Sequence, residues 1–203
     1  MKIICIGRNY AEHAKELNNP VPEEPVFFMK PDSAILINNK PFFLPDFSDE
    51  IHHEVEIVIK INRLGKNVQK KFAPRYYKEI TVGIDFTARD LQRICKAQGK
   101  PWEIAKGFDG SAVLGEFISL SELKNQEEID FSLKINGVKV QTGNTRDMLF
   151  GIDRIIEYVS QFMTLKMGDI IYTGTPAGVG PVKINDRLEA YIEDRKLLDF
   201  MVK

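Results

Sequence analysis

The segment HHEVEIVIK, from His52 to Lys60, decides the interpretation of the chain. Most of it is typical of a buried β-strand, yet it carries two glutamates, Glu54 and Glu56, one residue apart. Because side chains two positions apart in a strand point to the same face, the two carboxylates project together, with Cβ atoms about 6.6 to 7 Å apart. His52 shares this face and His53 lies on the opposite one. Because a hard divalent cation favours oxygen ligands, we expect the two histidines to give supporting hydrogen bonds only.

Two interpretations of this doublet are open. Converging carboxylates repel one another unless a cation lies between them, and oxygen ligands favour Mg²⁺, Mn²⁺ or Ca²⁺ over zinc. Asp85, at the end of an apolar strand and before a helix, is the best candidate for a third ligand. Alternatively, Glu54 and Glu56 lie on a solvated sheet face and pair with Lys or Arg across strands, while Asp85 is a cap or turn residue.

The composition excludes the disordered and fibrous classes, since 43% of the 203 residues are hydrophobic and 28% are charged. A net charge of -1 provides no overall positive potential that would attract nucleic acid or anionic lipid. The basic segment from Lys66 to Lys78 is predicted to be a solvated loop, with a nucleic-acid surface as the alternative. The sequence has no membrane span or signal-peptide pattern, so we expect a cytoplasmic protein in which Cys5 and Cys95 are buried thiols.

The pattern of apolar residues predicts about ten short strands and two or three helices without βαβ alternation. This indicates an α+β fold with mixed or antiparallel sheet, in one domain over residues 1–203. Thr87 and Asp90 resemble a capping box, with Leu91, Ile94 and Cys95 as the buried stripe of the helix that follows. The predicted strands are 2–6, 26–29, 34–37, 53–61, 80–86, 131–135, 139–141, 169–173, 187–192 and 197–202, and the predicted helices are 10–17, 87–99 and 149–165.

Other candidate residues lie on three further segments. His13 and Glu16, three apart on one helix face, match a pair that activates water, or an incidental exposed histidine. Lys106 could steady a developing enolate, or lie on the surface. The segment TGTPAGVGPV (173–182) lacks the GK[ST] of a phosphate loop, but its amides or the Thr175 hydroxyl could meet an anion; a plain loop is the alternative.

Together these segments resemble the fumarylacetoacetate hydrolase family. The resemblance runs in family order from residue 7 to about residue 182, which makes it far more specific than any single motif. The matching stretches are GRNYAEHAKEL, EPVFFMKP, HHEVEIVIK, GIDFTARDLQ, GKPWEIAKGFD, NTRDMLF and GDIIYTGTPAGVGPV.

The resemblance implies the family's α+β catalytic domain, usually a homodimer, with Mg²⁺ or Mn²⁺ bound by Glu54, Glu56 and Asp85; Ca²⁺ would substitute in crystals. The additional N-terminal domain of fumarylacetoacetate hydrolase itself is not expected. The implied activity is acylpyruvate hydrolysis or oxaloacetate decarboxylation, on small 2-oxo or 1,3-dicarbonyl acids through a metal-bound enolate. The alternatives are an isomerase, tautomerase or decarboxylase of an aromatic-catabolism intermediate, or a catalytically silent carboxylate-binding homologue.

The resemblance also implies roles for single residues. His13 with Glu16 would activate water, and Lys106 would stabilise the enolate. The loop from Asn18 to Pro25 is a candidate lid, while Tyr10 and Phe28 would pack around the pocket. The expected substrate contacts are Arg8, Lys30, Arg89, Gln92 and Thr175.

Overall fold

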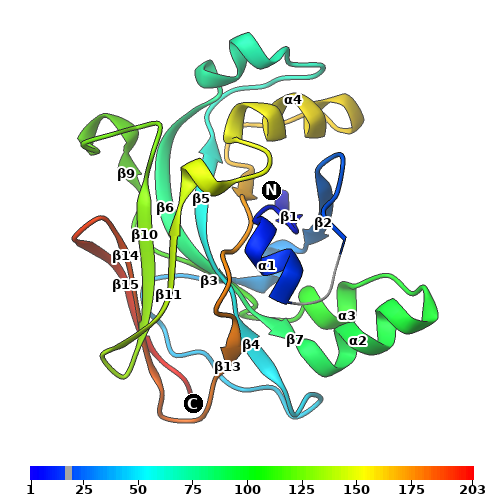
Figure 1. The fold of residues 1–203 in the computed structure, drawn as a ribbon, viewed down its shortest axis with the longest axis vertical. Helices are drawn as coiled ribbons and strands as arrows, with labels where there is room; N and C mark the ends of the chain where they lie inside the picture. Colours follow the sequence, from blue (N-terminus) through cyan, green and yellow to red (C-terminus); the bar gives the residue numbers. More distant parts are fainter. Residues whose placement is uncertain (17–19) are drawn as a thin grey trace.

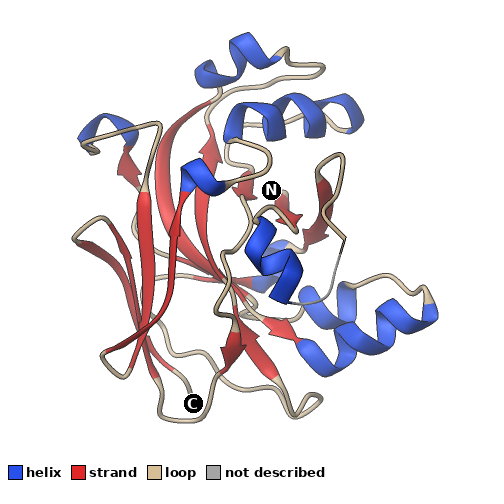
Figure 2. Ribbon diagram, in the orientation of Figure 1, coloured by secondary structure: helices blue, strands red, loops and turns tan. Residues whose placement is uncertain are grey.

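The computed structural model describes residues 1–16 and 20–203. It has the predicted α+β architecture, in which curled β-sheets form the body of the molecule and a few helices lie around them (Figures 1 and 2). Both cysteines are buried and free, as expected. Within the described residues, no helix combines the length and the apolar character needed to cross a membrane.

The largest sheet is mixed and has the predicted segments 53–61 and 80–86 at its centre. β1 is parallel to β12 and β3 is parallel to β8, while the other pairs are antiparallel. The spatial order is β2 (Val26–Lys30), β1 (Ile3–Gly7), β12 (Ile170–Tyr172), β5 (Val55–Ile61), β6 (Tyr77–Asp85), β8 (Ala112–Leu114) and β3 (Ile35–Leu36), with β9 (Ile118–Ser119) paired to β6.

Two smaller antiparallel sheets complete the strands. One has the order β11 (Val138–Asn144), β10 (Asp130–Ile135), β14 (Arg187–Ile192) and β15 (Arg195–Met201), and the other has the order β13 (Gly180–Pro181), β4 (Ile51–His53) and β7 (Thr87–Ala88). β10 and β11 form a hairpin. Its turn residues Asn136 and Gly137 have φ of 52° and 81°, the positive values that favour Asn-Gly in a two-residue hairpin.

The helices are short and lie around the large sheet (Figure 1). The α-helices are α1 (Ala11–Glu16), α2 (Arg89–Gln98), α3 (Glu103–Lys106) and α4 (Ile152–Phe162), and the 3₁₀-helices are η1 (Asp32–Ala34), η2 (Lys70–Arg75), η3 (Leu120–Glu122) and η4 (Thr145–Asp147). As predicted, α2 stops at Gly99, whose φ of 63° is the left-handed conformation of a helix C-cap.

One face of the large sheet is covered by two different elements. Val55 and Ile57 of β5 pack into a core shared with the four-stranded sheet, whereas Ile59 and Ile61 of the same strand pack with α4. The opposite face carries Cys5, Val58 and Tyr172, which form a smaller core. Strand alternation therefore places Glu56, two residues before Val58, on this second face.

The predicted strand 53–61 is broken at Glu54. Before this residue the chain pairs with β7 and β13 in the small sheet, and after it with β6 and β12 in the large sheet. The Glu54 carbonyl accepts a hydrogen bond from the Asp85 amide at 2.9 Å. The break thus lies where the chain passes between two sheets, and it brings the backbones of two of the predicted ligands together.

The predicted capping box is wrong. The helix begins at Arg89, because Thr87 is a β7 residue whose hydroxyl accepts a hydrogen bond from Lys106. Asp90 instead binds the Ser48 hydroxyl at 2.6 Å. Ile94, predicted to be buried, is 46% exposed.

Two other segments are predicted loops. The basic segment from Lys66 to Lys78 is not a plain solvated loop, because it contains η2 and contributes Val68 and Ala73 to the core beneath α4. In the candidate lid from Asn18 to Pro25, Asn18 and Asn19 lie outside the described residues. Closure of that loop stays a prediction.

Candidate metal centre and pocket

The three predicted carboxylate ligands meet at one point. Glu54 joins β4 to β5, Glu56 lies on β5 and Asp85 ends β6. Each offers an oxygen within 4.8 Å of the others, and their residue exposures are only 5%, 1% and 1%. The interpretation of Glu54 and Glu56 as a solvated sheet face is therefore wrong, and buried carboxylates at this density require compensating positive charge.

Lys106 supplies part of that charge. Its buried ammonium, at the end of α3, lies 2.9 Å from Glu54 Oε2 and 2.8 Å from Asp85 Oδ2, and donates to the Thr87 hydroxyl at 2.6 Å. Burial opposes the charged form of Lys106, but the carboxylates of Asp85 and Glu54 outweigh it and raise its pKa. The side chain is thus a fixed cation, and the interpretation of Lys106 as a surface lysine is wrong.

Arg89 provides a second cation for Glu54. Its Nη2 pairs with Glu54 Oε1, and its Nη1 donates to Gln92 Oε1 at 2.6 Å. Burial would raise the pKa of Glu54, but Lys106 and then Arg89 hold it well below the usual value. Glu54 is therefore ionised, and Gln92 orients the guanidinium that keeps it so.

The pKa of Glu56 is shifted in the opposite direction from that of Glu54. Burial, with the charges of Asp85 and Glu54, raises the pKa of Glu56 well above its usual value. Its Oε2 accepts a hydrogen bond from the Gly174 amide at 2.7 Å, and no lysine or arginine among residues 1–16 and 20–203 forms an ion pair with it. Gly174 has a φ of +105°, and an added Cβ would lie 2.6 Å from Asn9 Cβ, so only glycine allows this approach.

The donor set fits a divalent cation. Three converging oxygens match the ligand preference of Mg²⁺, Mn²⁺ or Ca²⁺. Of the three carboxylates, only Glu56 has no lysine or arginine partner within the described residues. A positive charge bound beside Glu56 would therefore lower its pKa. Glu54, Glu56 and Asp85 can therefore hold a metal ion.

Lys30 lies behind the carboxylates and not in the pocket. Its fully buried ammonium is 2.7 Å from Asp85 Oδ1 and donates to the carbonyls of Phe86, Ser111 and Lys106, at 3.2, 3.0 and 2.5 Å. Four oxygens thus surround a group with three N–H donors, which leaves none for a substrate. The geometry favours a positioning role for Lys30 over the substrate contact expected from the resemblance.

His13 and Glu16 form the predicted pair on α1. His13 Nδ1 lies 3.1 Å from Glu16 Oε2, and Glu16 Oε1 accepts a hydrogen bond from the Gly178 amide at 3.0 Å. A carboxylate accepts only, so Nδ1 carries a proton, and in the neutral ring Nε2 keeps a lone pair. His13 is buried and lines the pocket, which excludes the incidental exposed histidine.

Arg8 reaches the pocket from a constrained backbone. Its φ is 57°, which is uncommon for a residue with a side chain. Asn9 holds the turn: its side-chain amide donates to the carbonyls of Phe150 and Thr173, at 2.9 and 2.8 Å, and its Oδ1 accepts from the Phe150 amide at 2.8 Å. Such over-determined strain is frequent at functional sites.

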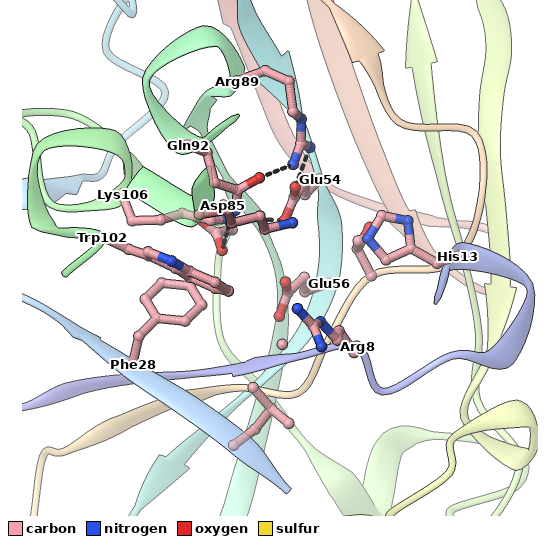
Figure 3. A pocket seen from close by; sticks show the side chains of 14 residues that line it. Arg8, His13, Phe28, Glu54, Glu56, Asp85, Arg89, Gln92, Trp102 and Lys106 are labelled. Atoms are coloured by element: carbon pink, nitrogen blue, oxygen red, sulfur yellow. Dashed lines mark hydrogen bonds and ion pairs between the residues drawn. The ribbon is translucent and has the colours of Figure 1, made fainter. Parts of the chain in front are cut away.

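These residues surround one small pocket (Figure 3). Glu16 and Lys30 are the two predicted site residues that do not line it. Phe28 does line it, as expected, but Tyr10 does not and packs against Phe131 in the core instead. The contributions of Lys96 and Trp102 were not predicted. The predicted residues that line it are Arg8, His13, Glu54, Glu56, Asp85, Arg89, Gln92, Lys106 and Thr175.

The Thr175 hydroxyl is already engaged. It donates to the Val55 carbonyl at 2.8 Å and accepts from Gln141 Nε2 at 3.0 Å. Gln141 Oε1 accepts from the Val55 amide at 3.1 Å and lies 2.8 Å from His53 Nδ1. The expected support from His53 therefore runs through Gln141, while His52 pairs with Glu50 at 3.0 Å. Gln141, on β11, had no sequence signal.

We expect Gln141→Leu to lower the free energy of unfolding by at least about 2 kcal/mol, because each buried polar group left unpaired costs about 1–3 kcal/mol. The groups affected are the Val55 amide, the His53 ring and the Pro176 carbonyl. Urea denaturation measures the change. The matched control is Gln161→Leu at an exposed position of α4, with an expected change within about 0.5 kcal/mol. Equal effects of the two substitutions would contradict a stabilising role for the Gln141 hydrogen bonds.

Comparison with known proteins agrees with this geometry. The model of the fumarylacetoacetate (FAA) hydrolase C-terminal family matches residues 2–201. Oxaloacetate tautomerase FAHD1 of Arabidopsis thaliana is 42% identical over 100% of this chain and 91% of its own length. Oxaloacetate decarboxylase of Dictyostelium discoideum is 44% identical over 90% of this chain and 84% of its own.

A solved structure of a related enzyme has a similar fold. Fumarylpyruvate hydrolase from Pseudomonas aeruginosa, in complex with Mn²⁺ and pyruvate, superposes with a TM-score of 0.94 at 32% identity, covering 100% of this chain and 89% of that one. The family match covers nearly the whole chain, and the resemblance seen in the motifs is confirmed. This chain is a member of the fumarylacetoacetate hydrolase family.

Proposed function

We propose that this chain is a divalent-metal-dependent enzyme that acts on small 2-oxo acids, cleaving acylpyruvates hydrolytically or decarboxylating oxaloacetate. The observation that carries the proposal is one pocket that holds both the three-carboxylate cage and the ring of His13. Similarity to an Mn²⁺- and pyruvate-bound hydrolase and to two oxaloacetate enzymes supports it. We propose Mg²⁺ as the physiological ion, with Mn²⁺ able to replace it.

The cage would supply electrophilic chemistry when it is loaded. A divalent ion held by Glu54, Glu56 and Asp85 would act as a Lewis acid toward a carbonyl oxygen. Lys106 places a permanent positive charge beside the same carboxylates, where it would stabilise negative charge that develops on a substrate oxygen. Because Lys30 fixes Asp85 from behind, it would keep this arrangement rigid without touching the substrate.

His13 would act as the general base of the reaction. With Nδ1 held by Glu16, its Nε2 can take a proton from water during hydrolysis, or from a substrate carbon during tautomerisation. Loss of CO₂ from oxaloacetate needs no attacking water. Because Nε2 can also take a proton from a substrate carbon, a tautomerase or isomerase activity is a second candidate, and the similarity to an oxaloacetate tautomerase favours it.

Removal of divalent ions tests the proposal. We expect activity on acetylpyruvate and oxaloacetate to disappear with EDTA and to return with Mg²⁺ or Mn²⁺. Calorimetry gives an independent readout, in which Glu56→Gln weakens Mn²⁺ binding at least about tenfold because a charged oxygen ligand is lost. The control is Glu79→Gln, a partly exposed residue of β6 that pairs with Lys60. Undiminished activity in EDTA would contradict the metal mechanism.

The same experiments separate the rival interpretations. A catalytically silent carboxylate-binding homologue would bind Mn²⁺ and pyruvate without turnover of either substrate. Separate detection of hydrolysis products, of CO₂ and of keto–enol exchange distinguishes the hydrolase, decarboxylase and tautomerase activities. A homodimer in the cytoplasm and one domain over residues 1–203 stay predictions.

A further inference from the structure

Lys96 is a pocket residue that the mechanism above does not use. It lies on α2 and lines the same pocket as the carboxylate cage. No carboxylate in the described part of the chain pairs with it; its ammonium instead lies 5.5 Å from the centre of the Trp102 ring. An ammonium without an ion-pair partner at a pocket wall is available to an anionic ligand.

Helix geometry explains its position. Arg89, Gln92 and Lys96 are at positions i, i+3 and i+7 of α2, so they share one helix face. Arg89 and Gln92 are buried and the former pairs with Glu54, whereas Lys96 is exposed. Seven residues of helix span about 10 Å, so Lys96 lines the pocket two helical turns beyond Arg89, the residue whose guanidinium pairs with Glu54 (Figure 3).

A second cation reaches the same pocket from the other side. Arg8 has no ion-pair partner among residues 1–16 and 20–203, and its buried Nε makes no hydrogen bond. Partial burial, and then the positive charges of Arg8 and Arg89, lower the pKa of Lys96 to about 8. These like charges repel one another, so a bound anion would remove an unfavourable interaction.

We propose that Lys96, with Arg8, binds the distal carboxylate of the substrate and so makes the enzyme selective for 2-oxo dicarboxylic acids over monocarboxylic ones. The proposal rests on the proposed function and deepens it. The 2-oxo acid end would face the cage, and the chain between the two ends would lie against the aromatic pair of Phe28 and Trp102, whose ring centroids are 5.7 Å apart.

Matched ligands isolate the distal charge. 2-Oxoglutarate and 2-oxopentanoate differ only by a carboxylate in place of a methyl group, and calorimetry with the Mn²⁺-loaded enzyme gives the Kd of each. We expect the wild type to prefer the diacid. Lys96→Met should lower that preference roughly 10- to 100-fold, the range for one charge-assisted hydrogen bond, and Lys96→Arg should restore most of it.

Lys100→Met is the control, since this exposed lysine lies beyond Gly99 and outside the pocket lining. An unchanged preference in Lys96→Met, or an equal loss in Lys100→Met, would overturn the proposal. A wild type that binds both ligands equally would also overturn it. If the wild type binds neither ligand, the proposed function fails too; if it cleaves acylpyruvates without diacid preference, only this inference fails.

The same preference should depend on pH. The charged groups facing Lys96 are Arg8, Arg89, Glu54 and Lys106. Below a pH of about 8 the free enzyme carries a protonated Lys96, so the diacid preference is complete; as the pH rises above this value, binding of the diacid must also take up a proton and the preference declines. The ratio of the two Kd values cancels titrations that affect both ligands. A ratio that stays constant between pH 7 and about 9.5 would overturn this assignment of the anion-binding group.

Discussion

Lys30→Met is expected to lower the free energy of unfolding by about 3–5 kcal/mol, the cost of breaking a buried ion pair by removing one partner. The ammonium of Lys30 pairs with Asp85 and donates hydrogen bonds to the backbone carbonyls of Phe86, Lys106 and Ser111. Methionine fills a similar volume but donates no hydrogen bond, so all four oxygens would lose this donor. Urea denaturation in EDTA measures the loss without a contribution from bound metal.

Lys60→Met is the matched control. Lys60 also belongs to the large sheet, where it pairs with Glu79 at 2.8 Å, but the two side chains are 32% and 45% exposed. Exposed pairs contribute about 0–1 kcal/mol, so the control should change the free energy of unfolding by no more than this. If Lys30→Met is as stable as the control but has lost its affinity for 2-oxo acids, Lys30 is a substrate contact after all.

The contrast between Lys30 and Glu56 shows what the sequence can predict. Strand alternation is a local rule, so the spacing of Glu54 and Glu56 predicted that the two carboxylates point the same way, and Asp85 was a candidate partner from its place at a strand end. The spacing alone left a solvated sheet face open. The partners of Lys30 lie 55 to 81 residues away in sequence, and backbone carbonyls carry no residue-specific signal. Its role could therefore not be predicted from the pattern.

Other differences have similar causes. Thr87 has the sequence of a cap, but its hydroxyl binds Lys106 because tertiary contacts prevail over local preference. Gln141 approaches from a different sheet, which no periodicity indicates. Lys96 is a different case: its helical spacing from Arg89 and Gln92 was visible in the sequence and would have placed it on the pocket face.

His13→Ala is expected to reduce acylpyruvate hydrolysis by about 10²- to 10⁴-fold, the usual contribution of general base catalysis, while sparing much of any oxaloacetate decarboxylation. The difference follows from the chemistry, because only hydrolysis needs an activated water. Parallel assays of the two reactions on the same Mg²⁺-loaded preparation measure it. Glu16→Gln should reduce hydrolysis less, since the amide oxygen can still accept from Nδ1 but no longer stabilises the protonated ring.

His52→Ala is the control for this pair of variants, because His52 binds Glu50 and does not line the pocket; both of its activities should equal those of the wild type. Intact hydrolysis in His13→Ala would show that another group activates the water. Equal loss of both reactions, with unchanged binding of 2-oxo acids, would instead assign His13 to a proton transfer that the two reactions share. That outcome would favour the tautomerase candidate, in which Nε2 takes the proton from the substrate carbon itself.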